Sequence, residues 1–152
     1  PVTVEKVLQD VCSACSDGTP APLLFSAAAG VRVAIDREKL GAAVTHAIRN
    51  AQDATPAEGR IEVRLRADGS RAIIEVEDDG AGMDAEFLRN RLFKPFHTTK
   101  GAKGMGIGAY QIRETLRGAG GDVDVTSEVG HGTTLRMVLP LADAVSIRQT
   151  AA

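Results

Sequence analysis

Residues 61–77, IEVRLRADGSRAIIEVE, are the stretch that decides the fold class of this 152-residue chain. Apolar and polar side chains alternate on both sides of Asp68-Gly69, and a period of two is that of a β-strand. Asp-Gly is a preferred pair at the turn of a two-stranded antiparallel hairpin. The stretch therefore predicts a hairpin in a sheet that has one face wetter than the other.

Other strands are expected on both sides of this hairpin. Residues 122–128 and 133–141 flank the sequence VGHG and predict a second, closing hairpin. Residues 23–27 and 31–36 also have strand character, and we expect them to be joined near Gly30.

Helical spacing predicts the remaining elements. Thr3 and Asp36 are suitable N-caps, Val2 and Val7 could form a hydrophobic staple, and Asp84 could cap a short helix that ends near Leu92. The expected helices cover residues 4–16, 37–54, 85–92 and about 107–117. Helices mixed with antiparallel hairpins indicate an α+β fold, with one sheet covered on one face by helices.

The composition is that of one soluble globular domain, with 43% hydrophobic and 25% charged residues. Only 3% of the residues are aromatic, and the formal net charge is −2, so we expect no nucleic-acid partner. No apolar run approaches the roughly 18 residues of a membrane span. Because the chain begins at Pro1 without Met, we expect it to be a piece of a longer protein.

The two cysteines occur in CSAC, residues 12–15, which could be a redox pair or half of a zinc site. They continue the helical spacing of Val4, Val7, Leu8 and Val11. We therefore interpret them as two small apolar residues on the buried face of a helix.

The helix expected over residues 37–54 has two stripes. The first is apolar and consists of Leu40, Ala43, Val44, Ala47, Ile48 and Ala51. His46, Asn50 and Asp53 follow at i, i+4 and i+7 along its edge. The carboxamide oxygen of Asn50 could bind a Mg²⁺ ion that carries phosphates, whereas the alternative is a solvated helix face.

The sequence KGMGIGAY, residues 103–110, has three glycines at every second position. Such a backbone allows close approach, and a nucleotide phosphate is the obvious candidate. It is not a P-loop, because Gly106 is followed by Ile107, and the strand required before a dinucleotide fingerprint is missing. What remains is a glycine-rich stretch that runs into a helix N-terminus, where an anion is favoured.

The acidic stretch EVEDDGAGMDAE, residues 75–86, has the spacings of an EF-hand calcium loop. Glu stands where Asp is required, and a strand rather than a helix precedes it, which argues against calcium. The alternative is a strand that ends in an acidic residue, followed by glycines that leave space for a flat ligand. A buried carboxylate there would accept a hydrogen bond from the exocyclic amine of adenine.

Together these segments resemble a known family. The sequences HAIRNAQDA, DDGAG, LFKPFHTTKG, GMGIG and GHGTTL, between residues 46 and 135, resemble the N, G1, F, G2 and G3 boxes of the GHKL ATP-binding superfamily. Over residues 1–141 the chain looks like the catalytic ATP-binding domain of a sensor histidine kinase. The sequence from Pro95 to Tyr110 is similar to that of kinases linked to PEP-CTERM (exosortase) systems.

The resemblance implies a Bergerat-type α/β sandwich with a mixed, mostly antiparallel sheet and a mobile ATP lid over residues 93–103. It implies that Asn50 binds Mg²⁺, that Asp78 accepts from the adenine amine and that Thr133 lies near the adenine. Gly80 and Gly82 would make room beside the ring, and Phe93 and Phe96 would anchor the lid. The remaining residues implied for ATP are His46, Asp53, Thr98, Thr99, Lys100, Lys103, Gly104, Met105, Gly106, Ile107 and Gly108, with Lys100 and Asn50 assigned to catalysis.

Two departures from the family pattern refine the expected function. Ala109 and Tyr110 replace a leucine and a small polar residue. His46 stands four residues before Asn50, where hydrolytic members such as gyrase B keep a Glu as general base. Transfer of the γ-phosphate to another domain is therefore favoured over hydrolysis.

The expected acceptor is a histidine on a helical dimerisation domain N-terminal to Pro1, because none of His46, His97 and His131 has the context of a phosphoacceptor. The resemblance implies a monomeric fragment of a homodimeric parent, a membrane anchor with this domain in the cytoplasm, and a response regulator downstream. The alternatives are a serine kinase of the anti-sigma-factor type, a GHKL ATPase and a degenerate scaffold domain.

Overall fold

A computed structural model describes residues 1–26, 30–80 and 105–142. Its main feature is a five-stranded sheet in the order β2-β4-β5-β7-β6. β2 pairs with β4 in parallel, and the other three pairs are antiparallel, so the expected mixed, mostly antiparallel sheet is confirmed. The strands are β2 (Pro22–Ser26), β4 (Ile61–Asp68), β5 (Arg71–Asp78), β6 (Asp122–Glu128) and β7 (Gly132–Pro140).

Both expected hairpins are confirmed. β4 and β5 pair from Ile61↔Asp78 to Asp68↔Arg71, and Gly69 takes a φ of 60° at the turn, which a glycine adopts without strain. β6 and β7 pair from Glu128↔Gly132 onward. In this second turn Gly130 and Gly132 both have positive φ, at 85° and 103°.

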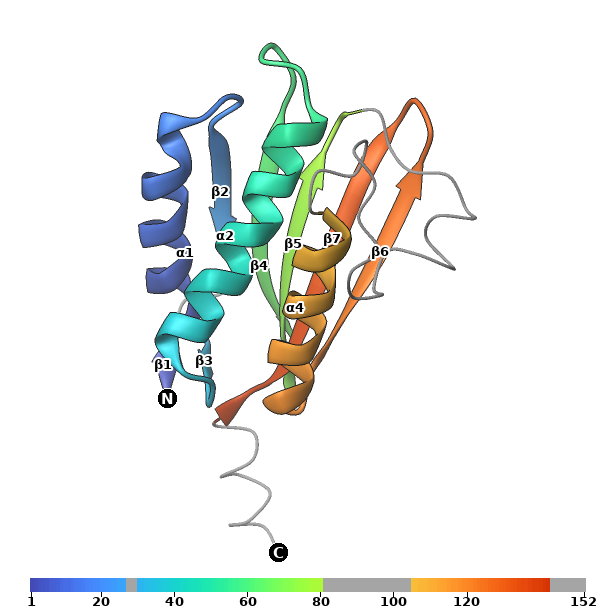
Figure 1. Cartoon of the computed structure of the whole chain (residues 1–152). Helices are drawn as coiled ribbons and strands as arrows, with labels where there is room; N and C mark the ends of the chain where they lie inside the picture. Colours follow the sequence, from blue (N-terminus) through green and yellow to red (C-terminus); the bar gives the residue numbers. More distant parts are fainter. Residues whose placement is uncertain (27–29, 81–104, 143–152) are drawn as a thin grey trace, which may run out of the picture.

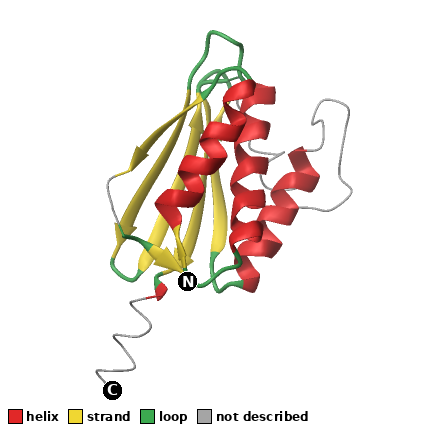
Figure 2. Ribbon diagram, turned by 90° about the vertical axis from the view of Figure 1, so that its left-hand side faces the viewer, coloured by secondary structure: helices red, strands yellow, loops and turns green. Residues whose placement is uncertain are grey.

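The helices α1 (Val4–Ala14), α2 (Arg37–Ala54) and α4 (Met105–Gly118) cover one face of the sheet (Figure 1). The view turned by 90° shows the helices and the sheet as two layers (Figure 2). The core lies between them and includes Leu8, Leu40 and Ile48 from the helices with Leu65 and Ile74 from the strands. The predicted α+β fold is confirmed.

The α2 boundaries agree with the sequence prediction, and the side chain of Asp36 accepts a hydrogen bond from the amide of Lys39 at 3.3 Å. At α1, Thr3 is the N-cap but its side chain makes no capping bond. The amide of Val4 instead donates to the carbonyl oxygen of Val31 at 2.9 Å. A backbone acceptor thus satisfies one of the free amides of the helix start.

One strand prediction was wrong in extent. Residues 31–36 form only β3 (Arg32–Val33), which pairs with β1 (Val2–Thr3) in a separate two-stranded sheet and not with β2. Val31, Val33 and Ile35 alternate in burial as a strand would. The partner β1 is two residues long, however, and Asp36 already caps α2, so backbone pairing stops early.

The cysteine prediction is confirmed. Cys12 lies on the buried side of α1, and Cys15 begins the short 3₁₀ helix Cys15–Asp17 that follows it; both are free and buried. Burial, together with the neighbouring Cys15, raises the pKa of Cys12 to about 11. Burial also raises the pKa of Cys15, so neither thiol has the lowered pKa of a reactive cysteine.

Some predictions lie outside the described residues. They are the helix over residues 85–92 with its cap Asp84, the lid over residues 93–103, and all but the first residue of the tail 142–152, which we expect from its sequence to be weakly structured. Among the helices that are described, none has the length and hydrophobicity needed to cross a membrane.

Candidate functional site

Asp78 is the last residue of β5 and shares the helix-covered face of that strand with Ile74 and Val76. Its exposed fraction is only 6%. The amide of Gly80 donates to its Oδ1 at 2.9 Å. Burial raises the pKa of Asp78, the amides of Gly80 and Thr133 lower it, and the charge of Asp79 raises it. Within the described ranges, Asp78 forms no ion pair with a lysine or arginine. A shielded carboxylate without a cation can accept hydrogen bonds from a ligand.

The strand register places two more polar residues beside Asp78. Asp78 pairs with Thr133 of β7, and Thr133 pairs with Ser127 of β6. The hydroxyls of Thr133 and Ser127 are 2.7 Å apart, and the Ser127 hydroxyl donates to the carbonyl oxygen of Gly132 at 3.1 Å. Three polar side chains thus form one row across the end of three neighbouring strands.

Two glycines allow the backbone to close tightly around this row. A Cβ on Gly80 would lie 2.2 Å from the carbonyl oxygen of Ala54, at the end of α2. A Cβ on Gly132 would lie 2.0 Å from the carbonyl oxygen of Asp78. No side chain fits at either position, so the ends of α2, β5 and β7 meet through glycine.

Thr55 follows α2 directly and is 6% exposed. Its hydroxyl lowers the pKa of Asp78, yet within the described ranges no partner stands at hydrogen-bonding geometry to Thr55 Oγ1. A buried hydroxyl without a partner is costly, and a bound ligand or water would satisfy it. The Asp78 end of the sheet therefore has the groups that a polar, flat ligand requires.

The polar stripe on α2 lies where its spacing predicted. Every member of the apolar stripe is buried, Asn50 is half-buried, and His46 and Asp53 are exposed. On another side of the helix, the side-chain amide of Gln52 donates to the carbonyl oxygens of Cys15 and Pro20, at 2.9 and 3.1 Å. Asn50 lies one helical turn before Ala54 and hence near the Asp78 end.

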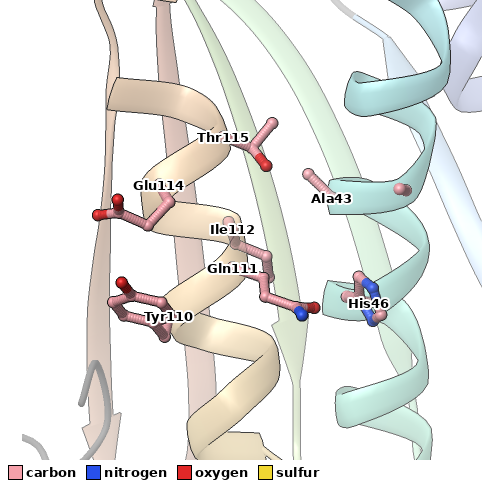
Figure 3. Close-up of a pocket in the computed structure, with 8 residues that line it drawn as sticks. Ala43, His46, Tyr110, Gln111, Ile112, Glu114 and Thr115 are labelled. Atoms are coloured by element: carbon pink, nitrogen blue, oxygen red, sulfur yellow. The ribbon is translucent and has the colours of Figure 1, made fainter. Parts of the chain in front are cut away.

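A groove of about 270 Å³ runs between α2 and α4 (Figure 3). His46 lines it from α2, and Tyr110, Gln111 and Glu114 line it from α4. In Figure 3 the side chain of Gln111 points toward His46. His46 of the polar stripe is thus accessible from this groove.

The helix α4 begins at Met105, within the glycine-rich stretch. Gly106, Ile107 and Gly108 therefore lie in its first turn, where backbone amides have no acceptor inside the helix. The predicted run of glycines into a helix N-terminus is confirmed. Such a terminus favours an anion through its free amides and its dipole.

The structure brings together part of the predicted site. Asp78, Gly80 and Thr133 lie side by side, and α2 carries Asn50 toward them. Eight of the predicted site residues lie outside the described residues: Gly82, Phe93, Phe96, Thr98, Thr99, Lys100, Lys103 and Gly104. In the described ranges, no three His, Cys, Asp or Glu side chains gather as a metal cluster.

Sequence reasoning missed Thr55, Ser127 and Gly132 at this site. The VGHG turn fixes the register that sets Ser127 opposite Thr133, so the second hairpin contained the signal for Ser127 and Gly132. Thr55 could have been noticed as a polar residue directly after the apolar stripe of a buried helix.

Comparison with known proteins identifies similar chains. Residues 35–143 match the family described as "Histidine kinase-, DNA gyrase B-, and HSP90-like ATPase". The signal transduction histidine-protein kinase AtoS of Escherichia coli is 35% identical over 70% of this chain and 17% of its own length. Sporulation kinase C of Bacillus subtilis is 32% identical over 77% of this chain and 27% of its own length. This chain thus spans well under a third of either relative.

The fold has a close counterpart among solved structures. The nucleotide-free catalytic domain of the histidine kinase ThkA superposes with a TM-score of 0.80 and 19% sequence identity. The match covers 91% of this chain and 93% of that domain. At this identity the likeness concerns the fold, which is the layered arrangement described above.

Proposed function

We propose a phosphotransfer role on the premise that this chain belongs to the family of histidine kinase-, DNA gyrase B- and HSP90-like ATPases. Membership makes it an ATP-binding domain. In this proposal it is the catalytic domain of a sensor histidine kinase, and it delivers the γ-phosphate of ATP to a histidine on a separate helical dimerisation domain. Relatives such as AtoS are histidine kinases several times longer than this chain.

The observation that carries the proposal is the isolated carboxylate of Asp78. It is buried, accepts from the amide of Gly80, and has no cationic partner in the described ranges. Its remaining acceptor capacity suits an exocyclic amine, which adenine has. Gly80 and Gly132 let the backbone pack closely around this carboxylate, where a side chain would clash with the backbone of Ala54 or Asp78.

The triphosphate would extend from the Asp78 end toward the start of α4. The amides of Gly106 and Gly108 lie there in the first turn of α4. In this proposal they bind the phosphates together with the amide of Gly104. We propose that Thr98, Thr99, Lys100 and Lys103, with neighbouring Met105 and Ile107, complete the phosphate site, that Phe93 and Phe96 anchor the lid, and that Gly82 adjoins the ring.

Asn50 offers a carboxamide oxygen, a ligand type that Mg²⁺ accepts, and Mg²⁺ typically takes few protein ligands beside substrate phosphates. When bound, Mg²⁺ would neutralise charge on the phosphates. His46 and Asp53 flank Asn50 on the same exposed stripe and would stand nearest the phosphates from α2. Asn50→Ala should abolish the Mg²⁺ enhancement of ATP affinity in calorimetry and keep the metal-free affinity. An equal loss with and without Mg²⁺ would instead indicate a packing role.

Transfer is favoured over hydrolysis because His46, and not a glutamate, lies one turn before Asn50. The groove beside His46 is open to solvent. In this proposal, the acceptor side chain of the second domain approaches from this side. The acceptor imidazole would attack the γ-phosphorus through its unprotonated nitrogen. The bond from phosphorus to the β,γ-bridging oxygen would break, and ADP would leave.

The partners and location follow from the same proposal. The acceptor domain belongs to the same parent protein, which would be a homodimer, whereas this fragment alone would be a monomer. A response regulator would take the phosphate onward. The domain would lie on the cytoplasmic side of a membrane-anchored parent protein. The link to exosortase systems stays a prediction.

Radiolabelled ATP tests the function. The fragment alone should bind ATP without labelling itself, because positioning the nucleophile is most of the work in phosphoryl transfer. Addition of the helical domain in trans should produce an acid-labile, base-stable phosphate, as phosphohistidine is. Stable self-labelling would support a serine kinase instead, and turnover by the fragment at roughly 1 s⁻¹ or faster would support an ATPase.

A further inference from the structure

Ser127 is a polar residue of β6 that the proposed function leaves without a role. Its side chain lies in the row that also contains Asp78 and Thr133. It contacts two groups next to Asp78, the hydroxyl of Thr133 at 2.7 Å and the carbonyl oxygen of Gly132 at 3.1 Å. Ser127 can therefore act on the site through Thr133.

The direction of these hydrogen bonds follows from the number of protons. A hydroxyl has one proton to donate and two lone pairs that accept, whereas a carbonyl oxygen only accepts. When Ser127 donates to Gly132, the short contact with Thr133 requires that Thr133 donates to Ser127. The remaining acceptor capacity of Thr133 Oγ1 is then left for other groups at the site.

The carboxylate of Asp78 is also an acceptor, and its strand neighbour Thr133 offers it a backbone amide. The end of the site thus presents two acceptors side by side. An amine or a bridging water can donate to both of them. A carbonyl oxygen on the ligand would meet two acceptors and would lose its hydrogen bonds, which is costly in a buried site.

We propose that Ser127 is a positioning residue that fixes the Thr133 hydroxyl as an acceptor and so selects an amino-purine over an oxo-purine nucleotide. The inference rests on the proposed function, since it assumes that the base binds at Asp78. The role of Ser127 concerns which purine bases the site prefers. The proposal that ATP binds at Asp78 does not by itself answer that question.

The test compares ATP with inosine triphosphate, whose base carries a carbonyl oxygen in place of the amine. Calorimetry should give a preference of the wild type for ATP. Ser127→Ala frees the Thr133 proton, so it can donate to a carbonyl oxygen, and the preference should narrow by roughly three- to tenfold. Ser127→Thr keeps the hydroxyl and should keep the wild-type preference. The ratio is measured within each variant, so a small loss of folded protein cancels.

A double-mutant cycle with Thr133→Val shows whether Ser127 acts through Thr133. In the Thr133→Val background, Ser127→Ala should leave the ATP-to-inosine triphosphate ratio unchanged. The inference is overturned if Ser127→Ala weakens both nucleotides equally, or if its effect on the ratio persists without the Thr133 hydroxyl. A wild type that binds neither nucleotide contradicts the proposed function itself, whereas a preference that Ser127→Ala leaves intact contradicts only the role of Ser127.

Discussion

Two carboxylates on one strand differ in what surrounds them. Glu75 and Asp78 both belong to β5, and both are shielded from solvent, since the Glu75 side chain is 12% exposed and Asp78 is 6% exposed. Glu75 lies on the face away from the helices, within 3.1–3.9 Å of Arg64, Arg66 and Arg136. Asp78 lies on the helix-covered face, where the amides of Gly80 and Thr133 and the hydroxyl of Thr55 lower its pKa, and the charge of Asp79 raises it.

The difference separates a structural acid from a functional one. The charge of Glu75 is compensated by three guanidinium groups from the neighbouring strands, and this leaves it little capacity for a ligand. Asp78 has no such compensation, so its charged form costs stability. Its oxygens, however, stay able to accept hydrogen bonds from a ligand. A shielded carboxylate without a cation is therefore the stronger indication of a binding site.

The largest expected effect is the loss of nucleotide binding in Asp78→Ala. Removal of the acceptor leaves the adenine amine unpaired, which weakens ATP binding on the order of tenfold to a hundredfold. Glu75→Gln is the matched control and should bind ATP as the wild type does. Isothermal titration of both variants measures the difference, and wild-type affinity in Asp78→Ala would refute the adenine assignment.

Crowding the close backbone contact between Gly132 and Asp78 should have the next largest effect. Gly132→Ala would place a Cβ 2.0 Å from the carbonyl oxygen of Asp78, at a φ of 103°. Gly130 also has positive φ, 85°, but has no atom within 4 Å of such a Cβ, which makes Gly130→Ala the control. The free energy of unfolding in urea should fall by about 1–3 kcal/mol more for Gly132→Ala. Equal losses would mean that backbone strain alone explains both glycines.

Removing the charge of Glu75, on the sheet face away from the helices, should lower the free energy of unfolding only slightly. Glu75→Gln removes the shared partner of three arginines, and partly exposed ion pairs of this kind contribute about 1 kcal/mol or less. The loss in unfolding free energy should shrink at high salt, because screening weakens the interactions that were removed. A loss that salt does not change would show that Glu75 stabilises the sheet by packing.

The smallest effect concerns pH. Since burial raises the pKa of Asp78 above the 3.8 of an ordinary aspartate, the folded state binds its proton more tightly than the unfolded state does. The stability contributed by the protonated form is present below pH 3.8 and is lost as the pH rises through the folded pKa. As the pH rises through that window, the free energy of unfolding of the wild type should therefore fall relative to that of Asp78→Asn, which has no proton to lose there. Urea unfolding of both proteins at several pH values measures this difference. A stability difference that is constant with pH would contradict the raised pKa.

Local patterns predicted most of the fold. The alternation around Asp68-Gly69 and the cap at Asp36 depend on neighbouring residues, and both elements formed as expected. The strand over residues 31–36 was overestimated because its length depends on β1, which is distant in the sequence. Pairing with a remote partner is a property that a local pattern does not contain.

The residues of the candidate site divide in the same way, into those that a local pattern predicts and those that depend on contacts between distant segments. Asp78 was predictable, because it ends an alternating strand and Gly80 follows two positions later. The second hairpin could indicate that Ser127 faces Thr133, and Thr55 stood out as a polar residue after a buried stripe. That both lie near Asp78, however, depends on the approach of α2 and on the register of three strands. Their roles required the tertiary structure.

The most direct test of the central claim is to locate ATP on the folded domain by amide chemical shifts in nuclear magnetic resonance. On addition of ATP and Mg²⁺, the largest shifts should occur at the amides of Gly80 and Thr133, with a smaller one at Asn50. The amides of Leu23 and Phe25, on the edge strand β2, should stay unchanged. Shifts centred on β2, or none at Gly80 and Thr133 at saturating ATP, would contradict a nucleotide site at Asp78.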